Sequence, residues 1–199
     1  TDIKLDGHTL IMDAVVGEKE LKFGPASAEL GGQGLESLKV VGDMVHTKWR
    51  GIAGASVGIG ACLPQADGVI ETIYPDDFKI GGAYRACTEI ITPKMIRVII
   101  GVDDTDTPQQ GASWVASLMG MSCPYGRFLE HKIVQLNPKA PNKTTNCCST
   151  AVSFAVKPSE LDKLVDYCKE FIRKESYSDD TVMTVFTGLK QSDALVEWS

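Results

Sequence analysis

Three aspartates, Asp103, Asp104 and Asp106, directly follow an apolar run at residues 95–102. A run of this length predicts a strand that is buried on both faces, as in a sheet covered by helices. The carboxyl end of such a strand is where α/β proteins commonly place their ligands. Three acids within four residues repel one another unless water, a cation or basic groups neutralise them.

Magnesium is bound by carboxylate oxygens and commonly bridges to substrate phosphates. We therefore expect a Mg-nucleotide site at these aspartates. The alternative is a solvated acidic turn whose aspartates cap the next helix. A second acidic pair, Asp179-Asp180, precedes an apolar stretch. It either approaches the same metal from a neighbouring strand or forms a capped turn.

A polar segment at residues 136–146 lies between two predicted strands. Its prolines, Pro138 and Pro141, exclude a helix or an interior strand. The segment carries side chains that suit phosphate oxygens, namely Lys139, Lys143, Thr144, Thr145 and Asn146. If it faces the acidic strand end, a divalent cation and a triphosphate would find complementary surroundings. A solvated connection is the alternative.

The composition is that of an ordinary globular protein, with 199 residues of which 43% are hydrophobic and 23% are charged. The apolar runs are far shorter than the ~20 residues that cross a bilayer, and no targeting signal appears, which favours a cytoplasmic protein without a membrane partner. The net charge of −6 disfavours a general nucleic-acid binder. The six cysteines form no Cys-x-x-Cys pair, so the spacing indicates no zinc ribbon.

The chain divides near Thr92-Pro93. Residues 1–92 predict an N-terminal α/β region of unassigned role that begins with a hairpin at 9–23. Within this region the segment 51–60 spaces its glycines three, four and two apart. It is neither a P-loop nor a clean dinucleotide fingerprint. The glycines would either cradle a phosphate or allow close packing of a small-residue helix.

The second part, residues 93–199, has a more regular pattern. Hydrophobic periodicity predicts six elements in the order β-α-β-β-α-β, at residues 95–102, about 109–121, 132–136, 151–156, 159–174 and 182–186. This order is typical of a ferredoxin-like split unit, in which two helices cover one face of an antiparallel sheet. We therefore expect an α+β chain with a C-terminal ferredoxin-like nucleotide domain.

Four motifs of the second part come in one order and with similar spacing to those of a known domain. They are Ile96-Arg-Val-Ile-Ile-Gly-Val-Asp-Asp-Thr-Asp106, a helix after Gly111, Leu136-Asn-Pro with Pro141-Asn-Lys-Thr144, and Ala151-Val-Ser-Phe154. Together they resemble the kinase domain of the archaeal tRNA-isoleucine agmatinylcytidine synthetase, TiaS, over residues 95–187. The resemblance implies a domain that uses Mg-ATP to phosphorylate a cytidine oxygen, after which agmatine displaces the phosphate.

Carried over by position, the resemblance implies that Asp103, Asp104 and Asp106 form the metal and phosphate site, with Asp104 and Asp106 in catalytic roles. It implies that Lys143 and Thr144 form the opposing basic loop. The family's Arg-Gly-Asn after Lys-Thr is replaced here by Thr145-Asn-Cys-Cys-Ser149. With the neighbouring polar residues added, the expected cofactor-binding group is Asp103, Asn137, Lys143, Thr144, Thr145 and Asn146. The family's phosphoacceptor threonine falls at Ser113 in an ungapped count and at Trp114 when the glycines are aligned, so Ser113 is the candidate acceptor. The implied cofactors are Mg²⁺ and ATP, and tRNA is a candidate partner.

A second resemblance rests on Asp103-Asp-Thr-Asp-Thr107, Gly111-Ala-Ser-Trp114 and Gly58-Ile-Gly-Ala-Cys-Leu-Pro64. These motifs resemble the methanogenesis marker protein eleven family, which implies an archaeal protein linked to methane metabolism. An alternative function is then non-catalytic nucleotide binding or assembly. Another alternative is a haloacid-dehalogenase-like phosphatase, in which Asp104 would attack phosphorus and Asp106 would act as general acid and base.

Overall fold

The computed structural model describes residues 2–6, 9–79, 82–144, 146–188 and 191–198. Contacts divide the chain into two compact units, Thr1–Lys94 and Met95–Ser199. Each unit combines an antiparallel sheet with helices, so the chain has a mixed α and β composition that is compatible with the α+β class. Within the described ranges, each helix is too short or too polar to cross a membrane.

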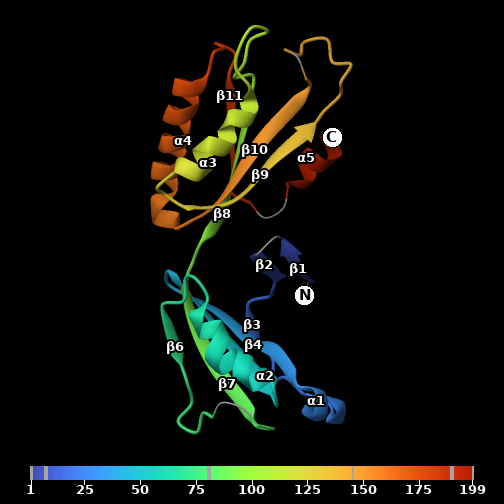
Figure 1. Cartoon of the computed structure of the whole chain (residues 1–199), viewed down its shortest axis with the longest axis vertical. Coiled ribbons are helices and arrows are strands. Elements are labelled where there is room, and N and C mark those ends of the chain that lie inside the picture. The colour runs from blue at the N-terminus through green and yellow to red at the C-terminus, as the bar shows by residue number, and fades with distance from the viewer. Residues whose placement is uncertain (1, 7–8, 80–81, 145, 189–190, 199) are drawn as a thin grey trace. The chain divides into compact units, whose positions relative to one another are not determined.

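The first unit contains a five-stranded sheet in the order β3-β4-β5-β7-β6, and each neighbouring pair is antiparallel (Figure 1). Its strands are β3 (Gly17–Glu18), β4 (Gly32–Val41), β5 (Met44–Ile52), β6 (Glu71–Ile73) and β7 (Arg85–Pro93). Its helical elements are α1 (Pro25–Leu30), α2 (Ala55–Val57), the π-helical turn Gly58–Cys62 and the 3₁₀ turn Leu63–Gln65.

The expected hairpin at residues 9–23 is wrong. The strand β2 (Thr9–Asp13) pairs instead with the preceding strand β1 (Asp2–Asp6), and the two form a separate ribbon. Residues 19–24 are not in a strand. A strand does begin at Thr9, as the sequence predicted, but it pairs with the segment that precedes it and not with the one that follows.

The glycine-spaced segment at 51–60 is largely helical and closely packed. A Cβ on Gly51 would lie 2.6 Å from Ile59 Cδ1 and 3.0 Å from the Ala55 carbonyl oxygen, and one on Gly60 would collide with the Phe78 ring. Ile59 is fully buried. Of the two interpretations of this segment, the structure therefore favours close packing over a phosphate-cradling loop.

The second unit contains a four-stranded antiparallel sheet in the order β11-β8-β10-β9. Its strands are β8 (Ile96–Asp103), β9 (Arg127–Gln135), β10 (Cys148–Val156) and β11 (Val182–Phe186). Its helices are α3 (Ala116–Ser122), α4 (Leu161–Glu175) and α5 (Asp193–Trp198). From β8 to β11, the strands and the helices α3 and α4 follow the order expected from the sequence.

The helix α3 begins later than the expected residue 109. Residues 107–110 form a turn closed by backbone hydrogen bonds between Thr107 and Gln110, and Gly111 follows at φ +93°. That left-handed backbone suits glycine and interrupts a helix. A 3₁₀ turn, Ser113–Val115, then leads into α3.

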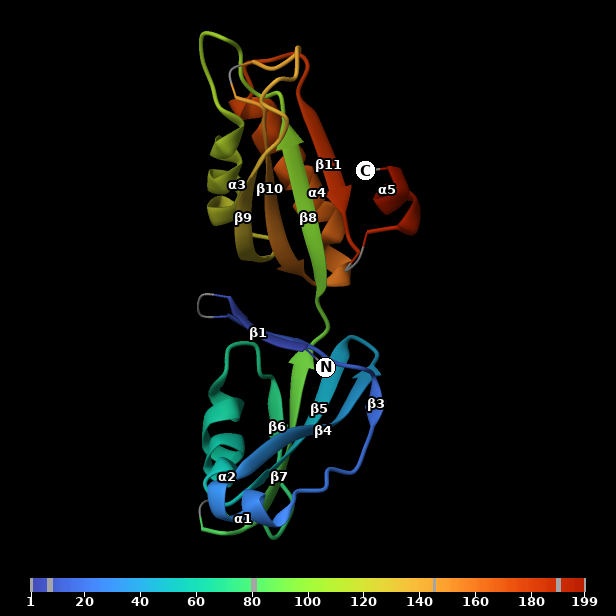
Figure 2. The ribbon, with the colours of Figure 1, turned by 90° about the vertical axis from the view of Figure 1, so that its right-hand side faces the viewer.

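Helices α3 and α4 cover the same face of this sheet (Figure 2). The core joins alternate strand residues to one side of each helix, and it consists of Val98, Ile100, Val102, Met119, Val152, Phe154, Val156, Leu164, Cys168 and Ile172. Along β8 the residues between the buried ones are partly exposed. The expectation that this strand is buried on both faces is therefore wrong, since the helices of the core cover one face.

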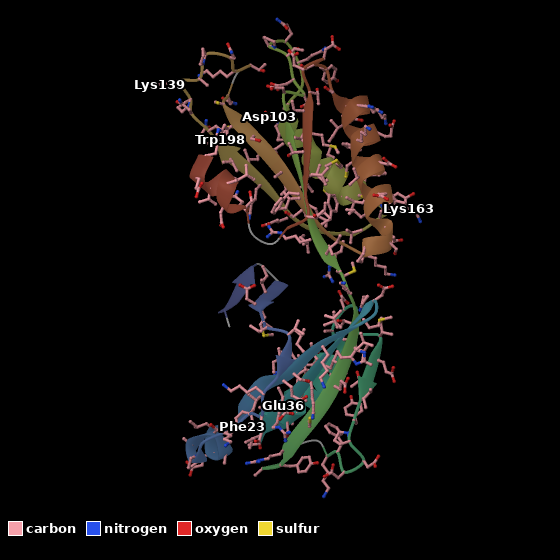
Figure 3. The ribbon with its side chains drawn as sticks, turned by 180° about the vertical axis from the view of Figure 1, so that it is seen from behind. Phe23, Glu36, Asp103, Lys139, Lys163 and Trp198 are labelled. Carbon is pink, nitrogen blue, oxygen red and sulfur yellow. The ribbon has the colours of Figure 1, made fainter. Side chains whose placement is uncertain are left out.

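At one end of this sheet, strands β8 and β9 end and strands β10 and β11 begin. Strands β8 and β9 run parallel to each other, because both are antiparallel to β10, which lies between them. Their carboxyl ends therefore lie at the same end of the sheet. Figure 3 shows Asp103 and Lys139 toward this end of the sheet.

Candidate functional site

Four carboxylates gather where β8 ends. Burial raises the pKa of Asp104, and repulsion from Asp103, Asp106 and Asp180 raises it further. Asp180 comes from the turn before β11, which begins opposite Asp103 through the pair Val182–Asp103. Of the pair Asp179-Asp180, Asp180 thus raises the pKa of Asp104, whereas Asp179 lines a different cavity beside α4. A cation placed among these groups would relieve their mutual repulsion.

The backbone of the acidic segment is held by the turn before β11. Asp104 adopts φ +53°, a left-handed conformation that aspartate tolerates better than most residues. Its N–H donates to Asp103 Oδ1 at 3.0 Å, and its carbonyl oxygen accepts a hydrogen bond from Thr181 Oγ1 at 3.0 Å. The next carbonyl, that of Thr105, accepts from the Tyr177 N–H at 2.9 Å. These bonds set the direction in which the carboxylates leave the chain.

The acidic cluster suits a cation that needs few protein ligands. Among the described residues, no three His, Cys, Asp or Glu side chains are arranged to hold a metal ion. Magnesium usually keeps several waters and is bound through one or two carboxylates plus substrate phosphates. The hard oxygen donors of this cluster therefore fit Mg²⁺ in the presence of a phosphate ligand better than a metal caged by protein alone.

A cavity of about 200 Å³ lies beside Asp106. It is bounded by the turn before α3 and by the facing ends of β9 and β10, through Asp106, Ala112, Ser113, Trp114, Ile133, Asn146, Cys148, Ser149 and Thr150. The cavity therefore brings together three residues that the sequence singled out in separate segments. These are Asp106, Ser113 and Asn146.

Ser113 is tied to the acidic segment. Thr105 Oγ1 donates to Ser113 Oγ at 3.0 Å, and the Thr105 N–H donates to the same oxygen at 3.4 Å. Thr105 is buried, with 3% of its surface exposed. A hydroxyl oxygen accepts two hydrogen bonds, so the proton of Ser113 is the remaining group that it can donate. Ser113 and Trp114, the two alternatives for the acceptor position, line the same cavity.

Of the polar segment at residues 136–146, Asn146 lines the cavity. Asn137 Oδ1 accepts from the Lys139 N–H at 3.0 Å, and the Lys143 ammonium donates to the Pro138 carbonyl oxygen, so both side chains bond within their own loop. Thr144 is half-buried and is not among the cavity residues. Thr145 lies outside the described residues. The charges that shift the pKa of Asp104 are all carboxylates, namely Asp103, Asp106 and Asp180.

Sequence reasoning did not find the contribution of β9 and β10 to the cavity. Ile133 pairs with Thr150 across these strands, and both line the cavity. His131 Nε2 lies 2.5 Å from Thr150 Oγ1, and that hydroxyl also bonds to the Lys132 carbonyl oxygen at 3.2 Å. His131 is thus engaged with a threonine of the neighbouring strand. No local signal marks these residues, because strand pairing creates the wall.

Comparison with known proteins relates a part of the second unit to a known domain family. Residues 99–160, which run from β8 past the cavity to the start of α4, match the family model of the TiaS TCKD domain. Over this stretch the chain is TiaS-like. An uncharacterized protein of Methanocaldococcus jannaschii is 40% identical over 185 residues, which make up 90% of this chain and 59% of that relative. The chain therefore spans less than two thirds of the relative's length.

Three solved structures are similar to a part of the chain. The complex of TiaS with an isoleucine tRNA and ATP has a TM-score of 0.40 and 24% identity, and a tRNA fluorescent labeling enzyme has a TM-score of 0.39 and 24% identity. The complex of TiaS with the same tRNA, AMPCPP and agmatine has a TM-score of 0.35 and 27% identity. Each covers 45% of this chain and 23% of the other.

Proposed function

We propose that this chain binds Mg-ATP and transfers a phosphoryl group to an acceptor that is yet to be identified. The observation that carries this proposal is the gathering of Asp103, Asp104, Asp106 and Asp180 beside a cavity at the end of β8. Phosphoryl transfer depends mainly on positioning and on neutralising charge, so an oxygen-rich cation site next to a cavity is the arrangement that it needs.

Each group at the site has a proposed role. One or two of Asp103, Asp104 and Asp106 would hold Mg²⁺ together with the phosphates of the nucleotide, and the ion neutralises charge on those phosphates when it is bound. The N–H of Asp104 uses one oxygen of Asp103, so Asp103 also orients the backbone of its neighbour. Asn146 would contact the nucleotide from the opposite wall. Lys143, Thr144, Thr145 and Asn137 would join the site if the polar segment at residues 136–146 rearranges around a triphosphate.

Ser113 is the proposed acceptor within the chain. Transfer would form a bond between Ser113 Oγ and the γ-phosphorus, break the bond to ADP and pass the serine proton to Asp106, which lines the same cavity. The two hydrogen bonds from Thr105 hold Ser113 Oγ in place without using its proton. An acceptor on tRNA or on a small molecule is the alternative destination of the phosphoryl group.

The TiaS-like stretch supports two further proposals. The unit Met95–Ser199, with strand order β11-β8-β10-β9 and elements in the order β-α-β-β-α-β, is proposed to be a ferredoxin-like nucleotide domain of the TiaS kinase type. Cytoplasmic location, an archaeal source, a link to methanogenesis and tRNA as a partner stay proposals that follow from the sequence resemblances.

A non-catalytic nucleotide-binding or assembly protein is the second candidate function. The observation that favours it is the bonding of Ser113, whose oxygen is held by the buried Thr105 as a structural group would be. Trp114 at the neighbouring position carries no hydroxyl that could accept phosphate. A protein of this kind would keep the cavity and bind nucleotide without turnover.

The test is incubation of the purified chain with γ-labelled ATP and Mg²⁺. We expect slow ATP consumption that Asp104→Asn abolishes, because asparagine keeps the left-handed backbone but removes the charge. Asp166→Asn, which changes an exposed acid on α4, is the matched control and should retain the activity.

Each other result selects a different function. Saturable binding of ATP without turnover supports the nucleotide-binding protein. Hydrolysis of simple phosphate esters without ATP supports a phosphatase in which Asp104 is the nucleophile. Absence of any ATP binding in the wild-type chain contradicts both the phosphotransferase and the nucleotide-binding protein.

A further inference from the structure

A second cavity of the unit Met95–Ser199 lies beside the carboxyl end of α4. It measures about 510 Å³ and shares no lining residue with the cavity beside Asp106. Pockets for small molecules usually measure roughly 300–1,000 Å³. We propose that this second cavity binds a small zwitterion, namely an amino acid with an apolar side chain. Such binding is independent of the nucleotide site proposed above.

Two side chains of opposite charge line this cavity without a partner. Lys169 belongs to α4 and Asp179 to the turn before β11, and both residues are exposed. Among the residues that the structure describes, neither side chain forms an ion pair or a hydrogen bond, so the two do not reach each other. A ligand with one charge would satisfy one of them and partly desolvate the other. A ligand that carries both charges satisfies the two together.

Arg173 adds hydrogen-bond donors near Lys169. The two residues are four positions apart on α4, so they lie on the same face of the helix, and both line the cavity. One nitrogen of the Arg173 guanidinium donates to Glu170 Oε1 at 2.9 Å, which leaves the donors of the other nitrogens for a ligand. The carboxylate of the zwitterion would therefore bind at Lys169 and Arg173, and its ammonium group at Asp179.

The apolar part of the wall indicates the side chain of the ligand. Ile172 is buried, Met183 is partly buried against the core, and Tyr177 has 57% of its surface exposed. An apolar side chain that packs against Tyr177 and Met183 would remove apolar surface from water. We therefore expect leucine, methionine and phenylalanine to bind more tightly than glycine or serine.

Hydrogen bonds within the protein shape the rest of the wall. Ser176 Oγ bonds to Thr181 Oγ1 and donates to the Ser178 carbonyl oxygen at 3.1 Å, while the Asp180 N–H donates to Ser178 Oγ at 3.1 Å. Thr181 Oγ1 donates in addition to the Asp104 carbonyl oxygen at 3.0 Å. Because these hydroxyls are engaged, the charged side chains remain as the main polar contacts for a ligand. A wall that is already ordered lowers the entropy cost of binding.

The experiment titrates the purified chain with L-leucine by calorimetry, in the absence of nucleotide and Mg²⁺. Leucine should bind saturably. Isocaproate lacks the amino group and isoamylamine lacks the carboxylate, so each should bind more weakly than leucine. Lys169→Met and Asp179→Asn should each lower leucine affinity roughly 3- to 30-fold, between the effect of an exposed ion pair and that of a shielded charged hydrogen bond.

Matched variants test the orientation of the ligand. Isocaproate should lose affinity in Lys169→Met but not in Asp179→Asn, and isoamylamine should show the reverse pattern. Lys163→Met and Asp166→Asn change exposed residues of α4 outside the cavity, so both should bind leucine as the wild-type chain does.

Three outcomes would overturn the proposal. Equal affinity for leucine and isocaproate would show that the cavity recognises a carboxylate and not a zwitterion. Wild-type leucine affinity in both Lys169→Met and Asp179→Asn would place the binding elsewhere on the chain. Failure of the wild-type chain to bind leucine, methionine and phenylalanine rejects the proposal, whatever the chain does with ATP. Conversely, leucine binding by a chain that binds no ATP would leave this proposal standing while the proposed function fails.

Discussion

The hydroxyl of Thr105 donates a hydrogen bond to the hydroxyl oxygen of Ser113 over 3.0 Å. This bond joins the acidic segment after β8 to the 3₁₀ turn that carries Ser113 and Trp114. Thr105 is buried, so water does not compete freely for its hydroxyl. The relative placement of the carboxylates and of the cavity wall therefore depends on this pair.

Removing one partner of the pair should destabilise the second unit. Ser113→Ala leaves the buried hydroxyl of Thr105 without its acceptor, and we expect the free energy of unfolding to fall by about 1–3 kcal/mol. Thr105→Val removes the donor, and the double variant should lose less than the sum of the two single changes, because the bond is lost only once. Denaturant unfolding measures all three variants. Strict additivity of the two losses would show that the bond contributes nothing to stability.

Burial of Asp104, together with repulsion from the neighbouring carboxylates, predicts a specific dependence of stability on pH. Its pKa in the folded chain is raised above the ordinary value of 3.8, so the folded state holds this proton more tightly than the unfolded chain does. The free energy of unfolding therefore falls as the pH rises from 3.8 through the raised pKa. Asp104→Asn should raise the melting temperature at pH 7. Near pH 3, below both pKa values, this effect should no longer separate the melting temperatures of the variant and the wild-type chain.

Magnesium offers a second measurement on the same variant. Because Mg²⁺ would relieve the repulsion, it should raise the melting temperature of the wild-type chain at pH 7 and raise that of Asp104→Asn less. The control Asp166→Asn should respond to Mg²⁺ as the wild-type chain does. A lower melting temperature for Asp104→Asn than for the wild type at pH 7 would contradict the repulsion.

The glycines of the first unit allow a test of packing against phosphate binding. A Cβ at Gly51 meets Ile59 and the Ala55 backbone, so Gly51→Ala should cost about 1–3 kcal/mol of unfolding free energy. A Cβ at Gly58 meets only Gln33 Oε1 at 3.7 Å, an ordinary contact, and its backbone is helical. Gly58→Ala should therefore be neutral or stabilising by about 0.5–1 kcal/mol. Thermal or denaturant unfolding compares the two variants. A large loss of ATP affinity in Gly58→Ala would instead support the interpretation that the glycines cradle a phosphate.

Cys123 is expected to be the most reactive of the thiols in the second unit. A hydrogen bond from Cys168 lowers the pKa of Cys123 to about 7, and this effect exceeds the opposing effect of burial. About half of this thiol is then ionised at pH 7, so alkylation by iodoacetamide should be fast at neutral pH. Cys168→Ala removes the donor and should shift the midpoint of the rate–pH profile upward. Mass spectrometry locates the label, and a profile that does not move would exclude the bond between the two sulfurs.

Much of the second unit could be predicted from the sequence. The strand at 182–186 has the bounds that its apolar pattern indicated, and α4 buries Leu164, Cys168 and Ile172 at the helical spacing read from the chain. These features depend on residues a few positions apart, so a short segment contains the necessary information. The same is true of Asp103, Asp104 and Asp106, which are neighbours in sequence before they are neighbours in space.

Only the tertiary structure decided which groups surround those aspartates. Asp180 reaches Asp104 because β11 pairs with β8, and Ile133 and Thr150 form a cavity wall because β9 pairs with β10. Lys143, which the sequence placed opposite the acids, bonds to Pro138 in its own loop. Such outcomes depend on contacts between residues far apart in the chain, and the periodicity of one segment carries no information about its partner.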